Sequence, residues 1–351
     1  MRSRYPRLSL ADRSNLWIER PETPAHIAGL CIVEAAPLLD AHGELNLEMV
    51  KRRIELRLAR VPALRRVVRP TPPLCGPPLW IDDPHFSIDG HVYAVRLDPP
   101  GDEASLLAAA EHLLRPPLDR SRPLWELWFL TGLDSGRLGM LFKVHHALAD
   151  GLAAVALIMS FFDLEAGAPD PPSVAWNPAP APTAWALFGD NMRGKLTAAR
   201  SALAHPIRLA HSIGSAFTSS LGFLGSQHAA PRTSLNGRPG LARRIRVARL
   251  DLETARMVAH AHGATVNDVV LSVVTGGVRE LLIGRGEAIT DLELVVSVPA
   301  ALRSAETDRT LGNAAGALLV RLPVYEADAV RRLERVAVAT RSARRSSIPP
   351  T

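Results

Sequence analysis

The chain has 351 residues, 47% of them hydrophobic, and a formal net charge of +6. This length exceeds what one hydrophobic core usually serves, so two domains are expected, with a cleft between them as the default site. The basic residues are scattered and only 5% of residues are aromatic, which argues against a nucleic-acid groove and leaves a modest attraction to anionic surfaces.

The N-terminal domain is expected to cover residues 1–166 and to have a mixed α/β fold. Its first regular elements are predicted from hydrophobic periodicity. They are a helix at Leu47–Val61, a strand at Val92–Leu97 and a helix at Ala104–Leu114.

A β-hairpin is the local structure that the sequence of this domain predicts most clearly. Two apolar, aromatic-containing runs, Leu124–Leu130 and Leu138–Val144, are separated by Asp134-Ser135-Gly136. The run from Leu152 to Phe162 is almost wholly apolar and has the length of a helix, and Asp150 is placed to cap it.

The middle of the chain, residues 167–242, is rich in proline, alanine and serine. It is predicted to be a linker or crossover, with helical spacing from Trp185 to Leu224. Gly189 to Lys195 has the spacing of a phosphate loop, but Leu196 stands where that loop needs a hydroxyl, and no strand precedes it. The match is therefore attributed to chance.

The C-terminal domain is expected to cover residues 243–351 and to have an α/β pattern. Thr265 and Asp268 have the spacing of a capping box at the start of a helix. The predicted elements are strands at Arg243–Leu250, Leu292–Pro299 and Ala317–Leu322, and helices at Leu252–His262, Val266–Leu282 and Ala327–Arg345.

Two adjacent histidines, His145 and His146, are followed closely by Asp150 and Gly151. A histidine at a strand end, before a tight turn into a helix, can present a nitrogen that accepts a proton. Neighbouring strand residues point to opposite sides, so one ring is expected to face the cleft and the other to pack inside. A metal site at His146 and Asp150 would need a helix through both and a third ligand, so no metal is expected. Asp150 is assigned a structural role.

The cysteine count and the N-terminal segment indicate the compartment. Cys31 and Cys75 are the only cysteines, too few and too far apart for a disulfide framework or a zinc site. The segment from Met1 to Trp17 lacks the apolar core of a signal peptide, and no later run reaches membrane-spanning length. The protein is therefore expected to be cytoplasmic, with any membrane contact peripheral.

The segment from His145 to Gly151 matches an H-H-x-x-x-D-G motif, and further segments match the same family in the right order. These are Leu8–Glu19, Thr23–His26, Trp80–Pro84 with His91-Val92, Pro117–Glu126, Asn267–Leu271, Ser297–Pro299, Leu302-Arg303 and Leu311–Asn313. Over essentially its whole length the chain thus resembles the bacterial wax ester synthase/acyl-CoA:diacylglycerol acyltransferases, within the chloramphenicol-acetyltransferase-like and condensation-domain superfamily.

The resemblance implies two chloramphenicol-acetyltransferase-like α/β domains with a tunnel at their interface. It makes His146 the expected general base, with His145 as a supporting residue of the motif, and Gly151 would leave room for the thioester. Asn267 would polarise a carbonyl group or bind the acceptor. Family members extend further at the C-terminal end, so the second domain is expected to be truncated and to expose a sheet edge.

Two structural roles are also expected. The local spacing assigns Asp268 to the capping box. The resemblance implies that Arg303 pairs with Asp150 and braces the loop.

The implied function is transfer of a long-chain acyl group from acyl-CoA to diacylglycerol or a fatty alcohol, in triacylglycerol or wax ester synthesis. Acyl-CoA is a substrate, and no cofactor or nucleic acid is expected. The inner membrane face or lipid droplets are the expected places of contact. Two alternatives stay open, namely a non-catalytic lipid- or droplet-associating protein and an acyltransferase that takes its acyl group from a carrier-protein pantetheine.

Overall fold

The computed structural model describes residues 4–134, 136–163, 165, 167–204, 231–300 and 316–346. These residues form two compact units. The first contains the described residues up to 204 together with 239–246, and the second contains 231–238, 247–300 and 316–346. Each unit combines helices with a β-sheet, so the predicted α/β class is confirmed. The domain bounds drawn at residues 166 and 242 stay a prediction.

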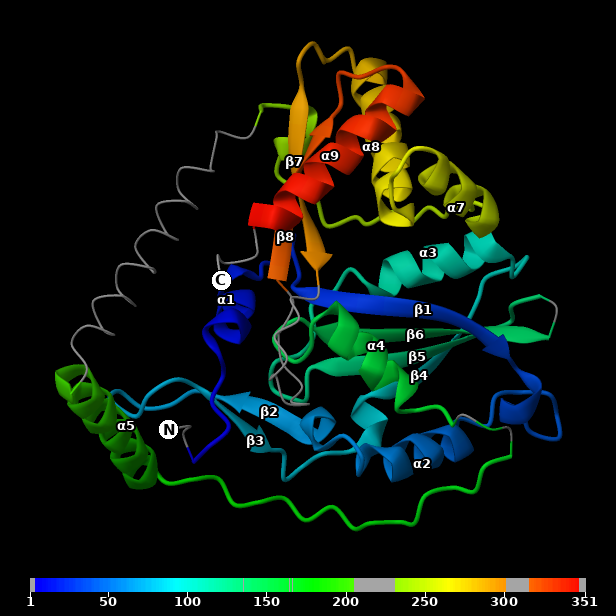
Figure 1. The fold of residues 1–351 in the computed structure, drawn as a ribbon. Coiled ribbons are helices and arrows are strands. Elements are labelled where there is room, and N and C mark those ends of the chain that lie inside the picture. The colour runs from blue at the N-terminus through cyan, green and yellow to red at the C-terminus, as the bar shows by residue number, and fades with distance from the viewer. Residues whose placement is uncertain are drawn as a thin grey trace. The chain divides into compact units, whose positions relative to one another are not determined.

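A four-stranded sheet forms the centre of the first unit, in the order β1-β6-β5-β4 (Figure 1). Its strands are β1 (His26–Glu34), β4 (Val92–Arg96), β5 (Trp125–Thr131) and β6 (Arg137–His145). β5 and β6 pair antiparallel, with Trp125 opposite Val144, which confirms the predicted hairpin. β4 runs parallel to β5, and β1 runs antiparallel to β6. β6 is therefore an inner strand, and all its residues after the first are buried.

Helices cover both faces of this sheet because its apolar residues alternate between the faces. The elements concerned are α2 (Leu47–Leu58), α3 (Glu103–Leu113) and α4 (Gly151–Met159), close to their predicted bounds. Phe142 packs in the core cluster that includes residues of α2 and α4. Its neighbour Leu141 packs in the cluster that includes residues of α3.

Smaller elements complete the first unit. They are α1 (Leu10–Ile18), α5 (Ala184–Ala204), the antiparallel pair β2 (Arg66–Arg69) and β3 (Leu79–Asp82), and the 3-10 turns η1 (Ala36–Leu38), η2 (Pro62–Arg65) and η3 (Ile88–Gly90). The Gly189–Lys195 segment lies inside the continuous helix α5, so it does not form a phosphate loop. The helical spacing predicted beyond Ala204 falls outside the described residues.

The strand predicted at Arg243–Leu250 is wrong. This segment has no regular secondary structure, and the N–H of Ile245 donates to the Glu111 carboxylate at 2.6 Å. A strand needs a neighbouring strand to complete its hydrogen bonds, and within the described residues this segment has none. The alternation of apolar residues in this segment is therefore not sufficient to form a strand.

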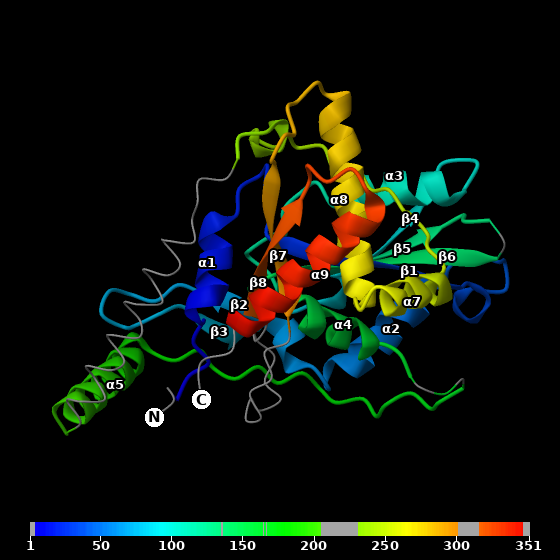
Figure 2. The same cartoon turned by 45° about the horizontal axis from the view of Figure 1, so that its top comes forward.

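The second unit contains the elements predicted for it after residue 250. They are α7 (Leu252–Ala261), α8 (Val266–Gly284), β7 (Glu293–Ala300), β8 (Gly316–Pro323) and α9 (Ala329–Ser346). It also contains the short 3-10 turn η4 (Ser234–Asn236), which was not predicted. β7 and β8 pair antiparallel, with Val296 opposite Val320. α9 packs on this pair through Val336, and in both views it lies along the two strands (Figures 1 and 2).

Three properties bear on the environment of the chain. Cys31 and Cys75 are both free thiols. Among the described residues, no helix is both long and apolar enough to cross a bilayer. The same part of the chain gathers no group of three or more histidine, cysteine or acidic residues of the kind that holds a metal ion.

Candidate active site

The paired histidines lie where the inner strand β6 ends. The N–H of His145, its last residue, donates to the carbonyl of Leu124 at 3.0 Å. The N–H of His146 donates to the carbonyl of Ala25 at 2.8 Å. Hydrogen bonds to both neighbouring chain segments therefore fix the backbone from which the two imidazoles project. The prediction that they lie at a strand end is confirmed.

His145 is wholly buried, and both of its ring nitrogens face specific groups. Its Nδ1 accepts a hydrogen bond from the N–H of Ala147 at 2.9 Å, which ties the ring to the turn after the strand. The proton of the neutral ring therefore sits on Nε2, which lies 3.5 Å from Oε1 of Glu19. Burial lowers the pKa of His145, and the Glu19 carboxylate opposes this effect. His145 is therefore neutral at pH 7.

Glu19 is itself held firmly. Its Oε1 accepts the N–H of Ala25 at 2.9 Å, and its Oε2 accepts from Arg120 at 2.6 and 3.1 Å. Burial alone would raise the pKa of Glu19, but these hydrogen bonds outweigh it and hold the pKa below its usual value. An ionised carboxylate thus faces His145. Sequence reasoning missed this role, although both residues lie in segments that resemble the family.

His146 differs from its neighbour in its surroundings. Its side chain is half-buried, whereas that of His145 is wholly buried. The side-chain amide of Asn15 donates to the His146 carbonyl at 3.3 Å, so α1 also helps to fix this turn. The turn therefore presents the His146 ring on a backbone that three segments of the first unit restrain.

Asp150 and Gly151 form the start of α4. The Oδ1 of Asp150 accepts the N–H of Ala153 at 2.9 Å, which confirms the predicted cap. The helix begins only at Gly151, after the His146 turn, so the helical metal site considered for His146 and Asp150 does not form. Gly151 is exposed, and a Cβ added there would meet no atom within 4 Å.

A second buried layer lies behind the histidines. Nε2 of His26, which pairs with His145 across the strands, lies 3.1 Å from the carbonyl of Leu114. The ammonium group of Lys143 donates to the carbonyls of Leu113 and Pro116. Burial, with Lys143 as the next cause, lowers the pKa of His26 to about 4. His26 and Lys143 therefore fasten the end of α3 beneath the strand end, a role that sequence reasoning did not assign.

The capping-box segment, from Thr265 to Asp268, lies in the second unit. The Thr265 hydroxyl accepts the Asp268 N–H, while Oδ2 of Asp268 accepts the N–H and hydroxyl of Thr265, both at 2.8 Å. This confirms the predicted capping box. Oδ1 of Asp268 also accepts the hydroxyl of Thr340 of α9 at 2.6 Å. Asn267 is exposed beside it. Arg303 lies outside the described residues, so its pairing with Asp150 stays a prediction.

Comparison with known proteins agrees with these features. A sequence profile of the wax ester synthase/diacylglycerol acyltransferase catalytic domain matches residues 8–270. A protein of Mycobacterium tuberculosis H37Rv named as a diacylglycerol O-acyltransferase is 31% identical over 344 residues, which cover 93% of this chain and 71% of the relative. Another from the same strain is 28% identical over 360 residues, covering 98% of this chain and 68% of the relative.

Solved structures share the fold. The wax ester synthase/diacylglycerol acyltransferase from Marinobacter aquaeolei VT8 superposes with a TM-score of 0.63 at 23% identity, covering 97% of this chain and 72% of that one. The first condensation domain of the calcium-dependent antibiotic synthetase gives 0.59 at 20% identity, covering 98% and 76%. Because the family profile spans most of the chain, this protein belongs to the wax ester synthase/diacylglycerol acyltransferase family of acyltransferases.

Proposed function

We propose that this acyltransferase moves a long-chain acyl group from acyl-CoA to the hydroxyl of a diacylglycerol or a fatty alcohol, with His146 as the general base. The observation that carries the proposal is the difference between the two histidines. His145 is buried, with Nδ1 in a hydrogen bond to the Ala147 N–H and Nε2 3.5 Å from Glu19, whereas His146 is half-buried and precedes the open position at Gly151.

The chemistry needs a base because an alcohol is a weak nucleophile at neutral pH. His146 removes the hydroxyl proton while the oxygen forms a bond to the thioester carbon, which contributes roughly 10²- to 10⁴-fold to the rate. The tetrahedral oxyanion then collapses, the carbon–sulfur bond breaks, and the imidazolium returns its proton to the CoA thiolate. Donors to the oxyanion are each worth about 2.7–4 kcal/mol, and Asn267 is the candidate donor.

His145, Glu19 and Arg120 act in this proposal as positioning residues. The ionised Glu19 faces the Nε2 side of His145, so the free Nδ1 lone pair accepts the Ala147 N–H and fixes the turn. Arg120 keeps Glu19 in place from the surface. A fixed turn matters because a small displacement of a general base is costly in rate.

Acyl-CoA enters the reaction as a substrate, and the acceptors are lipids of low solubility in water. The protein is therefore proposed to work at a lipid surface, at the inner membrane face or on lipid droplets. The tunnel expected between the domains also stays a proposal.

The test measures CoA release from palmitoyl-CoA by the purified chain, with diacylglycerol, with hexadecanol and without acceptor, and extracts the ester product. Release that depends on an acceptor would support the proposal and name the acceptor class. Ester formation only from a palmitoyl-loaded carrier protein would replace acyl-CoA as the donor. Lipid binding without any ester product, from a folded chain, would contradict the enzymatic role and favour a non-catalytic lipid-associating protein.

A further inference from the structure

Helix α5 is attached to the first unit by one side of its N-terminal half. Leu187 is buried against Cys75 and Leu79, and the Asn191 amide donates to the carbonyl of Leu74 at 2.7 Å. Arg7 pairs with Asp190 at 3.0 Å. From Arg193 onward, every residue of the helix whose burial is described is exposed. The second half of α5 therefore projects from the body of this unit.

The exposed side of α5 carries an apolar stripe. Trp185 and Leu203 are each 83% exposed, and Leu196 is 58% exposed. At 3.6 residues per turn, these three residues and Met192 fall within about 40° of one another around the axis. Leu187, which anchors the helix, lies about 160° away from Trp185. The stripe consequently points away from the surface on which α5 packs.

Basic residues flank this stripe on both sides. Arg193 and Arg200 follow one edge and Lys195 the other, at roughly 60–80° from the centre of the stripe. All three are exposed, and none forms an ion pair with another described residue. A helix with large apolar side chains between cationic ones is suited to lie in the interface of an anionic membrane.

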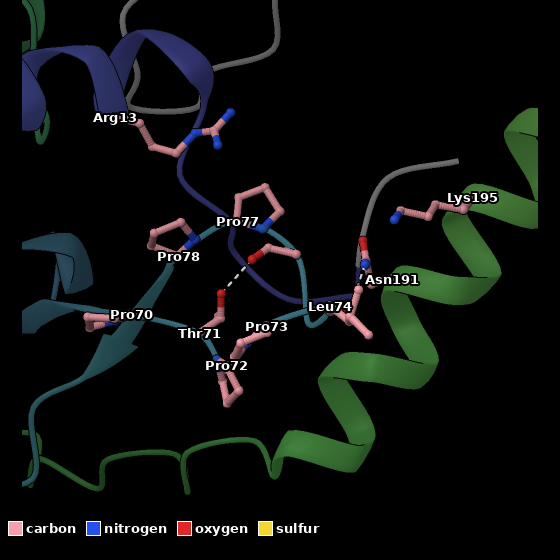
Figure 3. Close-up of a pocket in the computed structure, with 11 residues that line it drawn as sticks. Arg13, Pro70, Thr71, Pro72, Pro73, Leu74, Pro77, Pro78, Asn191 and Lys195 are labelled. Carbon is pink, nitrogen blue, oxygen red and sulfur yellow. Dashed lines mark hydrogen bonds between the residues drawn. The ribbon is translucent and has the colours of Figure 1, made fainter.

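An open hollow of about 630 Å³ lies beside the stripe, on its Lys195 side. It is lined by the proline-rich loop between β2 and β3, by Arg13 of α1 and by Asn191 and Lys195 of α5. Figure 3 shows the side chains of Arg13 and Lys195 extending toward this hollow from the two helices. Two cations at its edges favour a negatively charged headgroup over a neutral one.

We infer that the stripe of α5, with its basic flanks, binds the surface of an anionic phospholipid bilayer. Trp185, Leu196 and Leu203 enter the boundary between headgroups and acyl chains, and the lipid phosphates meet the flanking cations and the hollow. The inference deepens the proposed function, on which it rests for a lipid substrate, by naming the surface that meets the lipid. It assigns α5 to membrane contact and leaves His146 to the chemistry.

The experiment is co-sedimentation of the full chain with phosphatidylcholine vesicles and with phosphatidylcholine–phosphatidylglycerol vesicles, without acyl-CoA. The wild type is expected to bind the anionic vesicles preferentially, and less at high salt. The triple change Trp185→Ser, Leu196→Gln, Leu203→Gln is expected to weaken binding at least tenfold. The double change Arg193→Gln, Arg200→Gln should weaken binding on the order of tenfold, and only to the anionic vesicles.

A matched control replaces two exposed apolar residues outside α5, Val174→Gln and Leu241→Gln, and should bind like the wild type. Equal vesicle binding by the triple variant would overturn the inference. A lower melting temperature of the triple variant would also overturn the inference, because it would show that the chain itself covers the stripe. If the triple variant changed its oligomeric state and still bound vesicles, the stripe would be a contact with a second copy of the chain.

The activity of the triple variant on detergent-dispersed substrates separates the two proposals. Wild-type activity with lost vesicle binding supports the α5 surface. If neither protein makes ester while the wild type still binds vesicles through α5, the proposed function fails and the surface stands.

Discussion

Two segments lead into a helix that an aspartate helps to cap, one in each unit. They are residues 145–151, after strand β6, and residues 265–268, at the start of α8. In each, a buried aspartate caps the following helix, with Asp150 7% exposed and Asp268 2% exposed. In each, a polar neighbour is more accessible, His146 in the first segment and Asn267 in the second. The comparison shows that the aspartate of each segment takes part in local folding. The chemical roles of His146 and Asn267 belong to the proposal.

The two segments differ in what the aspartate holds. Asp150 caps α4 next to the histidine turn. Asp268 caps α8 and also accepts the hydroxyl of Thr340, so it joins α8 to α9. Loss of Asp268 should therefore affect folding more broadly within its unit, while changes near Asp150 should mainly affect the presentation of His146.

The largest expected effect is that of His146→Ala. Removal of the general base should lower acceptor-dependent CoA release roughly 10²- to 10⁴-fold. The melting temperature should stay close to that of the wild type because the ring is only half-buried. Wild-type turnover by His146→Ala would contradict the assignment of His146 as the general base.

Asp268→Ala should be the most destabilising of these changes. It removes the cap and leaves the Thr340 hydroxyl without its carboxylate, so unfolding should become easier by roughly 2–4 kcal/mol. Denaturation followed by far-ultraviolet circular dichroism would measure this. The matched control, Asn267→Ala, should leave stability nearly unchanged and reduce activity, and the reverse pattern would invalidate the assignment of roles.

Gly151→Ala separates access from stability. A Cβ at this position meets no atom within 4 Å, so unfolding should change by less than about 0.5 kcal/mol. If the thioester occupies this space, kcat/KM should fall on the order of tenfold or more through misplacement of the substrate. Unchanged kcat/KM would place the thioester elsewhere.

Acidic pH should lower the free energy of unfolding of the first unit, because this unit buries neutral histidines. Burial lowers the pKa of His26 to about 4 in the folded chain, whereas an unfolded histidine titrates near 6.5. Between these values the unfolded chain binds the proton more readily, so unfolding free energy should fall as pH drops from about 6.5 toward 4 and level off above 6.5. All six tryptophans belong to this unit, so their fluorescence reports its unfolding. His26→Gln should flatten the slope, and an unchanged slope would exclude His26 as its source.

Local features of both segments could be predicted from the sequence. A cap and its helix lie within a few residues of each other, so Asp150 and Asp268 were assigned correctly from spacing alone. The hairpin that ends at His145 could also be predicted from the sequence, because its turn and its two apolar runs are adjacent.

Contacts between distant parts of the chain could not be predicted in this way. Glu19 meets Arg120 across 101 positions, and Thr340 meets Asp268 across 72, so no spacing rule connects them. The strand predicted at residues 243–250 was wrong for a related reason, because strand formation depends on a partner strand as well as on local alternation.

The most direct test of the division between the two histidines is chemical rescue. Acceptor-dependent CoA release by His146→Ala and His145→Ala would be measured with and without added imidazole. The account predicts that imidazole restores part of the rate of His146→Ala, where it replaces the missing base, and does not restore His145→Ala, where a buried scaffold is lost. Rescue of His145→Ala instead, or a wild-type rate in unrescued His146→Ala, would contradict it.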